Sequence, residues 1–260
     1  IHPDPALVIG CFGAAEAFGV GALALSVRDA HSRLPEVDHP EAHVKRERHW
    51  FGVAAVVSLV TNQADTLLVA SILSPQDLGL FATASTLENG VATFATATAT
   101  PAAYRAIGSK LAGDLARGAH LLKRALTVAV ALAVVLAVVG WFVAILVGGS
   151  IDKFAGLADG DGPLVLALCL AAGPLGAVVA VNLIVGAGLG RHRPVGVRQI
   201  EVGACAVTAI VVGAAVAGPV GAAAGTIVRD AVGFLLTRGL TTPSPVSRPE
   251  PRSAGSPTPA

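Results

Sequence analysis

The sequence predicts an all-α integral membrane protein with seven transmembrane helices. Of the 260 residues, 53% are hydrophobic and 13% are charged, whereas soluble domains carry about 25% charged residues. Seven segments are apolar over the length that a helix needs to cross the hydrocarbon core, which is about 20 residues. The placement of Lys and Arg between these segments also gives them one consistent orientation.

The predicted spans follow one another closely, except after the first. They cover residues 5–27, 50–73, 78–103, 122–148, 163–190, 198–217 and 219–238. Residues 28–49 are rich in Pro, His and charge and predict a linker, while the Pro/Ser-rich residues 239–260 predict a disordered tail. The chain opens at Ile1 and enters an apolar run at once, so we expect it to be a piece of a longer protein.

Basic residues fall almost entirely on one side of the predicted spans. Sixteen of the eighteen lie there: Arg28, Arg33, Lys45, Arg46, Arg48, Arg105, Lys110, Arg117, Lys123, Arg124, Arg191, Arg193, Arg198, Arg238, Arg248 and Arg252. The other side receives Lys153, and Arg229 lies within a span. Because Lys and Arg accumulate in cytoplasmic loops, we expect the linker and the C-terminus to be cytoplasmic and Ile1 to lie on the outer face.

The second span carries polar groups at its centre. Asn62 and Asp65 are three residues apart and share one helical face with Ser58. An ionised carboxylate at the middle of a bilayer costs about 2.5–3.5 kcal/mol on insertion scales. Asp65 therefore indicates a site that faces a wet cavity and binds a coupling cation or a substrate hydroxyl; the alternative is an interhelical hydrogen bond that fixes packing.

The third span follows a short polar turn, Ser74–Asp77, and is polar along one side. Threonines and an asparagine recur every three or four residues, at Thr86, Asn89, Thr93, Thr96 and Thr100. Because a Thr hydroxyl can return to the carbonyl of the preceding turn, these residues are compatible with tight packing as well as with a polar path. Glu88 is more costly in lipid and is a second candidate site residue.

The last span carries Arg229 and Asp230 near its middle. Neighbouring residues on a helix point in different directions, so these two need not pair with each other. Arg229 is a candidate for binding a phosphate, or for reaching Asp65 or Glu88 across the bundle; a purely structural ion pair is the alternative. Weaker candidates for lining a path are Glu16, Asn182 and Glu201.

Small residues and one proline predict how the helices pack. The pairs Gly186/Gly190 and Gly221/Gly225 have the spacing that lets helix backbones approach closely in lipid. Pro174, preceded by a glycine, predicts a kink in the fifth span, either a transport hinge or a static bend.

No motif in the chain predicts an enzyme. The sequence contains no Walker loop, dinucleotide fingerprint, HExxH or GxSxG, so we expect no catalytic residues, no cofactor and no metal site. The net charge of +1 gives no reason to expect a nucleic-acid partner. The three cysteines, Cys11, Cys169 and Cys205, lie in apolar segments without paired spacing and predict buried thiols.

Two stretches resemble a known family. They read NQADTLLVASILSPQDLGLFATASTLENG, from Asn62, and GLGRHRPVGVRQIEVGACAVTAIVVGAAVAGPVGAAAGTIVRDAVGFLLT, from Gly188. The first is similar to the start, and the second to the end, of the second half of bacterial polysaccharide flippases in the multidrug/oligosaccharidyl-lipid/polysaccharide exporter superfamily. The resemblance covers residues 50–240. It implies that residues 50–238 form a six-helix lobe, that 5–27 ends a first lobe, and that 28–49 joins the two.

The resemblance implies a flippase of the bacterial plasma membrane. Such a protein moves a lipid-linked oligosaccharide or polysaccharide precursor, for the cell envelope, by alternating access between two lobes. Its partners would be membrane lipid, the lipid-linked glycan, and a missing first lobe or a second chain. The expected substrate- or ion-binding residues are Asn62, Asp65, Glu88, Arg229 and Asp230. The alternatives are a drug/cation antiporter of the same superfamily and a non-transporting scaffold for envelope polysaccharide synthesis. We also expect 5–27 to pack loosely against the six-helix lobe.

Overall fold

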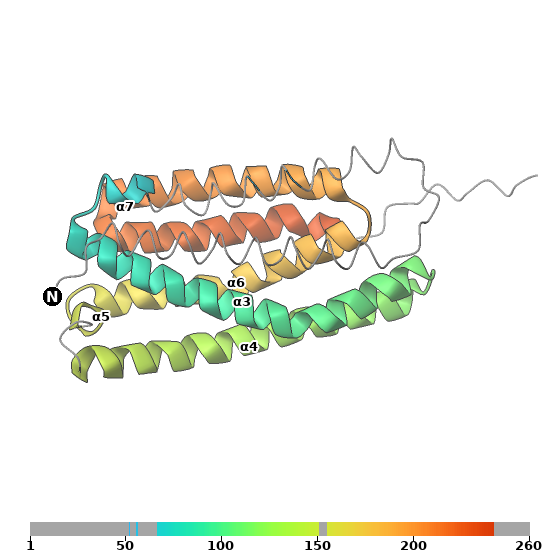
Figure 1. Ribbon diagram of the computed structural model, residues 1–260, viewed down its shortest axis with the longest axis horizontal. Coiled ribbons are helices and arrows are strands. Elements are labelled where there is room, and N and C mark those ends of the chain that lie inside the picture. Colours follow the sequence, from blue (N-terminus) through green and yellow to red (C-terminus); the bar gives the residue numbers. More distant parts are fainter. Residues whose placement is uncertain (1–51, 53–55, 57–66, 151–154, 242–260) are drawn as a thin grey trace, which may run out of the picture. The chain divides into compact units, whose positions relative to one another are not determined.

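The computed structural model describes residues 52, 56, 67–150 and 155–241 (Figure 1). The chain divides into two compact units, Ile1–Val44 and Lys45–Ala260, and every described residue belongs to the second. The predicted span 5–27 with its packing, the linker 28–49, most of the predicted span 50–73, and both Asn62 and Asp65 therefore lie outside the described residues.

The described part of the chain is helical and contains no strand. Its elements are α3 (Pro75–Leu111), α4 (Leu115–Ser150), α5 (Ala155–Ala158), α6 (Gly162–Gly188), α7 (His192–Thr237) and the 3₁₀ helix η2 (Arg238–Thr241). Three of the described helices are long and apolar enough to cross a membrane, Leu115–Gly149, Gly162–Gly188 and His192–Thr241. The chain thus has the helices of a membrane-spanning protein, while the count of seven spans and the second lobe stay predictions.

α7 is two antiparallel helical halves joined at a sharp break (Figure 1). Ala217 and Gly218 leave the helical region, and Gly218 takes a positive φ of 59° that favours glycine. A Cβ on Gly221 would lie 1.9 Å from the carbonyl oxygen of Gly213, and one on Gly225 would lie 2.6 Å from Cα of Ile210. The predicted Gly221/Gly225 pair therefore does let two backbones touch, and the break falls where spans 198–217 and 219–238 were predicted to separate.

Among the described helices, α6 is the central one and packs against α3, α4 and α7, whereas α3 and α7 meet each other over a small area. α3 turns a stripe of small residues toward this core, with Ala84, Ala95, Ala99 and Ala103 almost fully buried. Small side chains let helices approach closely, which is the main packing device in lipid. α4 exposes a broad apolar face on its other side, formed by Val128, Val130, Val134, Val135, Val138, Val139, Phe142, Val143 and Leu146.

The two ends of the helices differ in charge. α3 and α6 end, and α4 and α7 begin, at one end (Figure 1), which we call the basic end because it gathers Arg105, Lys110, Arg117, Lys123, Arg124, Arg191, Arg193, Arg198 and Arg238. The opposite end holds Asp77, Asp159 and Asp161 and, within the described residues, no Lys or Arg. The fold therefore brings the basic residues of the described part of the chain together on one side.

Two basic side chains donate hydrogen bonds to the backbone carbonyls of η2, at the end of the last helix. Lys110 Nζ donates a hydrogen bond of 2.6 Å to the carbonyl of Thr241. Nη1 of Arg191 donates to the carbonyls of Gly239 and Leu240, at 3.1 and 3.2 Å. These cations satisfy carbonyls that a helix end leaves without partners. Leu240 is itself buried, against Gly186.

Several local predictions need correction. The turn predicted at Ser74–Asp77 is largely the first turn of α3, because Ser74 caps the helix by accepting from the amide of Asp77 at 3.2 Å. α6 stays helical through Pro174, and a kink there stays a prediction; the break in helical φ/ψ angles lies at Ala217 and Gly218 of α7. Gly190 contributes a turn with φ of 75° rather than a packing surface. Residues 239–241 belong to η2, so the ordered part extends past the predicted start of the tail.

Candidate functional site

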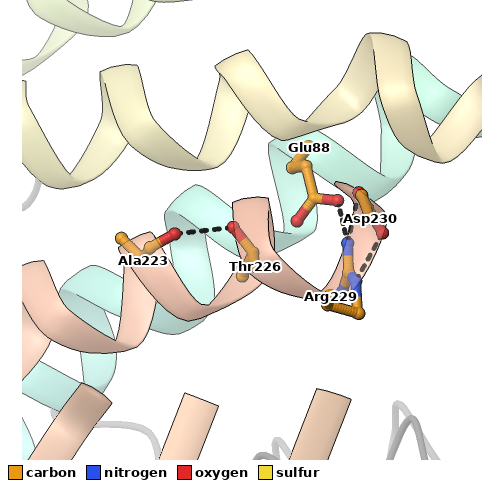
Figure 2. A network of polar contacts seen from close by, with 5 residues as sticks. All are labelled: Glu88, Ala223, Thr226, Arg229 and Asp230. Carbon is orange, nitrogen blue, oxygen red and sulfur yellow. Dashed lines mark hydrogen bonds and ion pairs between the residues drawn. The ribbon is translucent and has the colours of Figure 1, made fainter. Parts of the chain in front are cut away.

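Three charged side chains meet where α3, α6 and α7 come together (Figure 2). Arg229 of α7 donates from Nη2 to Oε1 of Glu88 on α3. It also donates from Nε to Oδ1 of Asp230, at 2.7 Å, and from Nη2 to Oδ2 of Asp230, at 2.9 Å. We call Glu88, Arg229 and Asp230 the charged triad.

The triad is almost closed to solvent. Glu88 is 1% exposed and Asp230 5% exposed, while the side chain of Arg229 is 16% exposed. Removing charges from water costs several kcal/mol per ion, and attraction between them offsets this only when the geometry is good. With two carboxylates facing one guanidinium, the fully ionised triad has an excess of one negative charge.

The position of each member follows from its helix. Glu88 falls in the buried stripe of α3 in register with Ala84, Val91 and Ala95, so the same periodicity that buries alanines buries this carboxylate. Asp230 is on the buried face of α7 in register with Thr226 and Gly233. Arg229 is at the edge of that face, from which its long side chain reaches across to α3.

Arg229 pairs with Asp230, a contact that the sequence left open. The Cβ atoms diverge as expected, but the Arg side chain is long enough to turn back and present the Nε–Nη2 edge to the adjacent carboxylate. The predicted reach of Arg229 to Glu88 is present. A possible contact with Asp65 lies outside the described residues.

α6 contributes two glycines beside the triad, which the sequence prediction missed. A Cβ on Gly173 would lie 3.2 Å from Cγ1 of Val91 and 3.7 Å from the carbonyl oxygen of Glu88. One on Gly176 would lie 3.0 Å from Oδ2 of Asp230 and 3.6 Å from Cβ of Ala92. In the sequence, Gly173 stood out only because it precedes Pro174. In the structure, its lack of a side chain lets α3 pack closely against α6.

The polar side of α3 flanks the triad. Thr86, Asn89 and Thr93 are exposed, and Thr96 and Thr100 are half-buried. Thr86 and Thr96 donate their hydroxyls to the carbonyls four residues earlier, both at 2.7 Å, as predicted for threonines in lipid. The amide of Asn89 is exposed and makes no such local bond within the described part of the chain.

The remaining candidates lie away from the triad. Asn182 is buried and donates to Oγ1 of Thr237 at 3.3 Å, which joins α6 to α7. Glu201 pairs with Arg198 on an exposed helix face. Neither is in contact with the triad.

Among the described residues, no three His, Cys, Asp or Glu side chains are grouped in a way that could hold a metal ion. Cys169 and Cys205 are free thiols, the first buried and the second half-buried. No family model, curated protein or solved structure matches the chain.

Proposed function

We propose that this chain belongs to a flippase that moves a lipid-linked oligosaccharide or polysaccharide precursor across the bacterial plasma membrane by alternating access. The observation that carries the proposal is the charged triad inside a bundle of apolar helices. Charged groups within membrane helices are rare and mark substrate or ion pathways, and a transporter site near the middle of the membrane is where alternating access operates. The basic end is the cytoplasmic side in this proposal.

Arg229 is the group that would bind the substrate headgroup. A guanidinium pairs with phosphate through two parallel hydrogen bonds, and lipid-linked sugars carry phosphate next to the lipid. Arg229 donates from Nε and Nη2, and its Nη1 protons make no bond within the described part of the chain. A phosphate would first meet Nη1 and then exchange with a carboxylate for the rest of the guanidinium.

The polar side of α3 supports a wet path beside this site. Exposed Asn89 and Thr93 would face lipid at a cost if the described helices stood alone in a bilayer. A second lobe across a hydrated cavity would remove that cost. In this arrangement the proposed partners are the lipid-linked glycan and the other lobe, supplied by the same protein or by another chain.

The excess negative charge of the triad favours one alternative, a drug/cation antiporter. An organic cation would bind Glu88 or Asp230 in place of Arg229. The full protein in proteoliposomes separates the two functions. A flippase moves a fluorescent short-chain lipid pyrophosphate-sugar between leaflets and does not transport a fluorescent cation. Movement of the lipid is measured by chemical quenching of the fluorophores in the outer leaflet. Transport of the cation alone would replace the flippase proposal with the antiporter.

A scaffold without transport activity is the third possibility. It predicts no movement of either compound by the wild-type protein, and no loss of envelope polysaccharide when the triad is neutralised. The flippase proposal predicts instead that Arg229→Met abolishes leaflet exchange while Arg198→Met does not. Arg198 is the matched control because it is also paired with a carboxylate but is exposed near the basic end.

A further inference from the structure

Asp230 is pressed against α6 at a place where that helix has no side chain. A Cβ on Gly176 would lie 3.0 Å from Oδ2 of Asp230, so a methyl group there requires the carboxylate to move. We propose that Gly176 is a positioning residue: it seats Asp230 on the Nε–Nη2 edge of Arg229 and so sets how strongly this carboxylate competes with an anionic headgroup. The competition between Asp230 and a headgroup rests on the proposed function. The contact by which Gly176 positions Asp230 does not.

The atom next to Gly176 is one that Arg229 uses. Oδ2 accepts from Nη2 at 2.9 Å, and Oδ1 accepts from Nε at 2.7 Å, so Asp230 occupies the guanidinium edge that pairs bidentately with carboxylate or phosphate. Displacing Oδ2 disturbs the Nη2 bond first and leaves Asp230 a weaker competitor for that edge. Glu88 reaches Nη2 from the other helix and is not in this contact.

Gly173, one turn earlier on α6, provides the matched control. The nearest atoms to a Cβ at that position belong to Val91 and to the backbone of Glu88, the closest at 3.2 Å. Gly173→Ala is thus another tight glycine substitution on the same helix, but its strain falls on α3. This variant therefore measures how much stability is lost when a methyl group is added to α6 without displacing Asp230.

A double-mutant cycle on the full chain in detergent tests the seating. The thermal unfolding midpoint is measured for Gly176→Ala, Asp230→Ala and the double variant. We expect Gly176→Ala to lower the midpoint in the wild-type background and to leave it unchanged or raised in the Asp230→Ala background, where the carboxylate is gone. Gly173→Ala should lower it equally in both. If Gly176→Ala lowers the midpoint equally in both backgrounds, Gly176 merely packs against α3 and the proposal is wrong.

Binding of a defined probe tests the competition. Farnesyl pyrophosphate supplies an isoprenoid pyrophosphate, and farnesol is the control without charge. We expect Gly176→Ala to tighten the apparent Kd for the pyrophosphate by roughly tenfold, the scale of one charge-assisted hydrogen bond, and Gly173→Ala to leave it unchanged. The double variant should bind no tighter than Asp230→Ala alone.

The two measurements separate the possible failures. An unchanged Kd in Gly176→Ala, with a wild-type protein that binds the probe, overturns the competition. If no variant binds the pyrophosphate, the competition and the proposed phosphate site both fall, while the unfolding cycle still decides whether Gly176 seats Asp230.

Discussion

Near Gly221 the second half of α7 packs directly on backbone, whereas two turns later, at Arg229, it meets α3 through charge. The first interface is built from glycine: a Cβ on Gly221 would lie 1.9 Å from the carbonyl oxygen of Gly213 in the facing half. The second interface joins two helices that otherwise meet over little area. Two backbones in direct contact can pack in only one arrangement. A charged side chain, in contrast, can exchange one ion-pair partner for another. We infer that the glycine interface stabilises the fold, whereas the charged triad binds the substrate in the proposed function.

The largest effect is expected at the glycine interface. Gly221→Ala places a methyl group on backbone that cannot turn aside, so we expect a loss of about 3 kcal/mol or more in the free energy of unfolding, seen as poor yield of monodisperse protein and a lowered unfolding midpoint. Gly90→Ala is the control, because its Cβ would meet nothing within 4 Å. A Gly221→Ala protein as stable as wild type would show that the two halves of α7 can separate freely.

The next effect is expected in the triad. Arg229→Met leaves Glu88 and Asp230 buried beside each other without their cation, and breaking a buried pair in this way costs about 3–5 kcal/mol. Neutralising all three, with Glu88→Gln, Arg229→Met and Asp230→Asn, should cost much less because no buried charge remains uncompensated. Unfolding midpoints of the two proteins test this order. If the neutral triple variant had the lower unfolding midpoint, the triad would serve chiefly to stabilise the fold.

A small, pH-dependent effect is expected at the basic end, far from both interfaces. Burial, and secondly the charge of Arg191, lower the pKa of Lys110 below 10.5. Between the folded pKa and 10.5 the unfolded chain binds more protons, so this group's contribution to stability rises with pH in that window. We expect Lys110→Gln to cost within about 1 kcal/mol at neutral pH.

The wild-type minus Lys110→Gln difference in unfolding midpoint should therefore grow as the pH approaches 10.5. Lys123→Gln, on the exposed surface of α4, is the control and should show no such trend. A difference that shrinks with pH would contradict the lowered pKa of Lys110.

Much of this architecture could be predicted from the sequence, because apolar length and charge placement act locally along each helix. The predicted segments 78–103 and 122–148 fall within α3 and α4, and 163–190 coincides with α6 except for its last two residues. The ends of the helices were harder to predict, because they depend on hydrogen bonds that a hydropathy pattern does not reveal. Examples are the cap at Ser74 and the bond from Lys110 to Thr241.

The triad was only partly predictable. Glu88, Arg229 and Asp230 stood out because charge is costly in apolar helices, but their partners depend on side-chain length and on how α3 and α7 pass α6. Gly176 gave no sequence signal, since its effect is the absence of a side chain beside Asp230. Asn62 and Asp65 stay predictions.

The most direct test of the charged triad as a functional site is leaflet exchange by the neutral variant carrying Glu88→Gln, Arg229→Met and Asp230→Asn. The full protein in proteoliposomes is assayed with the fluorescent lipid pyrophosphate-sugar, and its unfolding midpoint is measured in parallel. We predict a folded protein, with a midpoint near that of wild type, that no longer accelerates exchange. A folded neutral variant that exchanges the lipid at the wild-type rate would contradict the account.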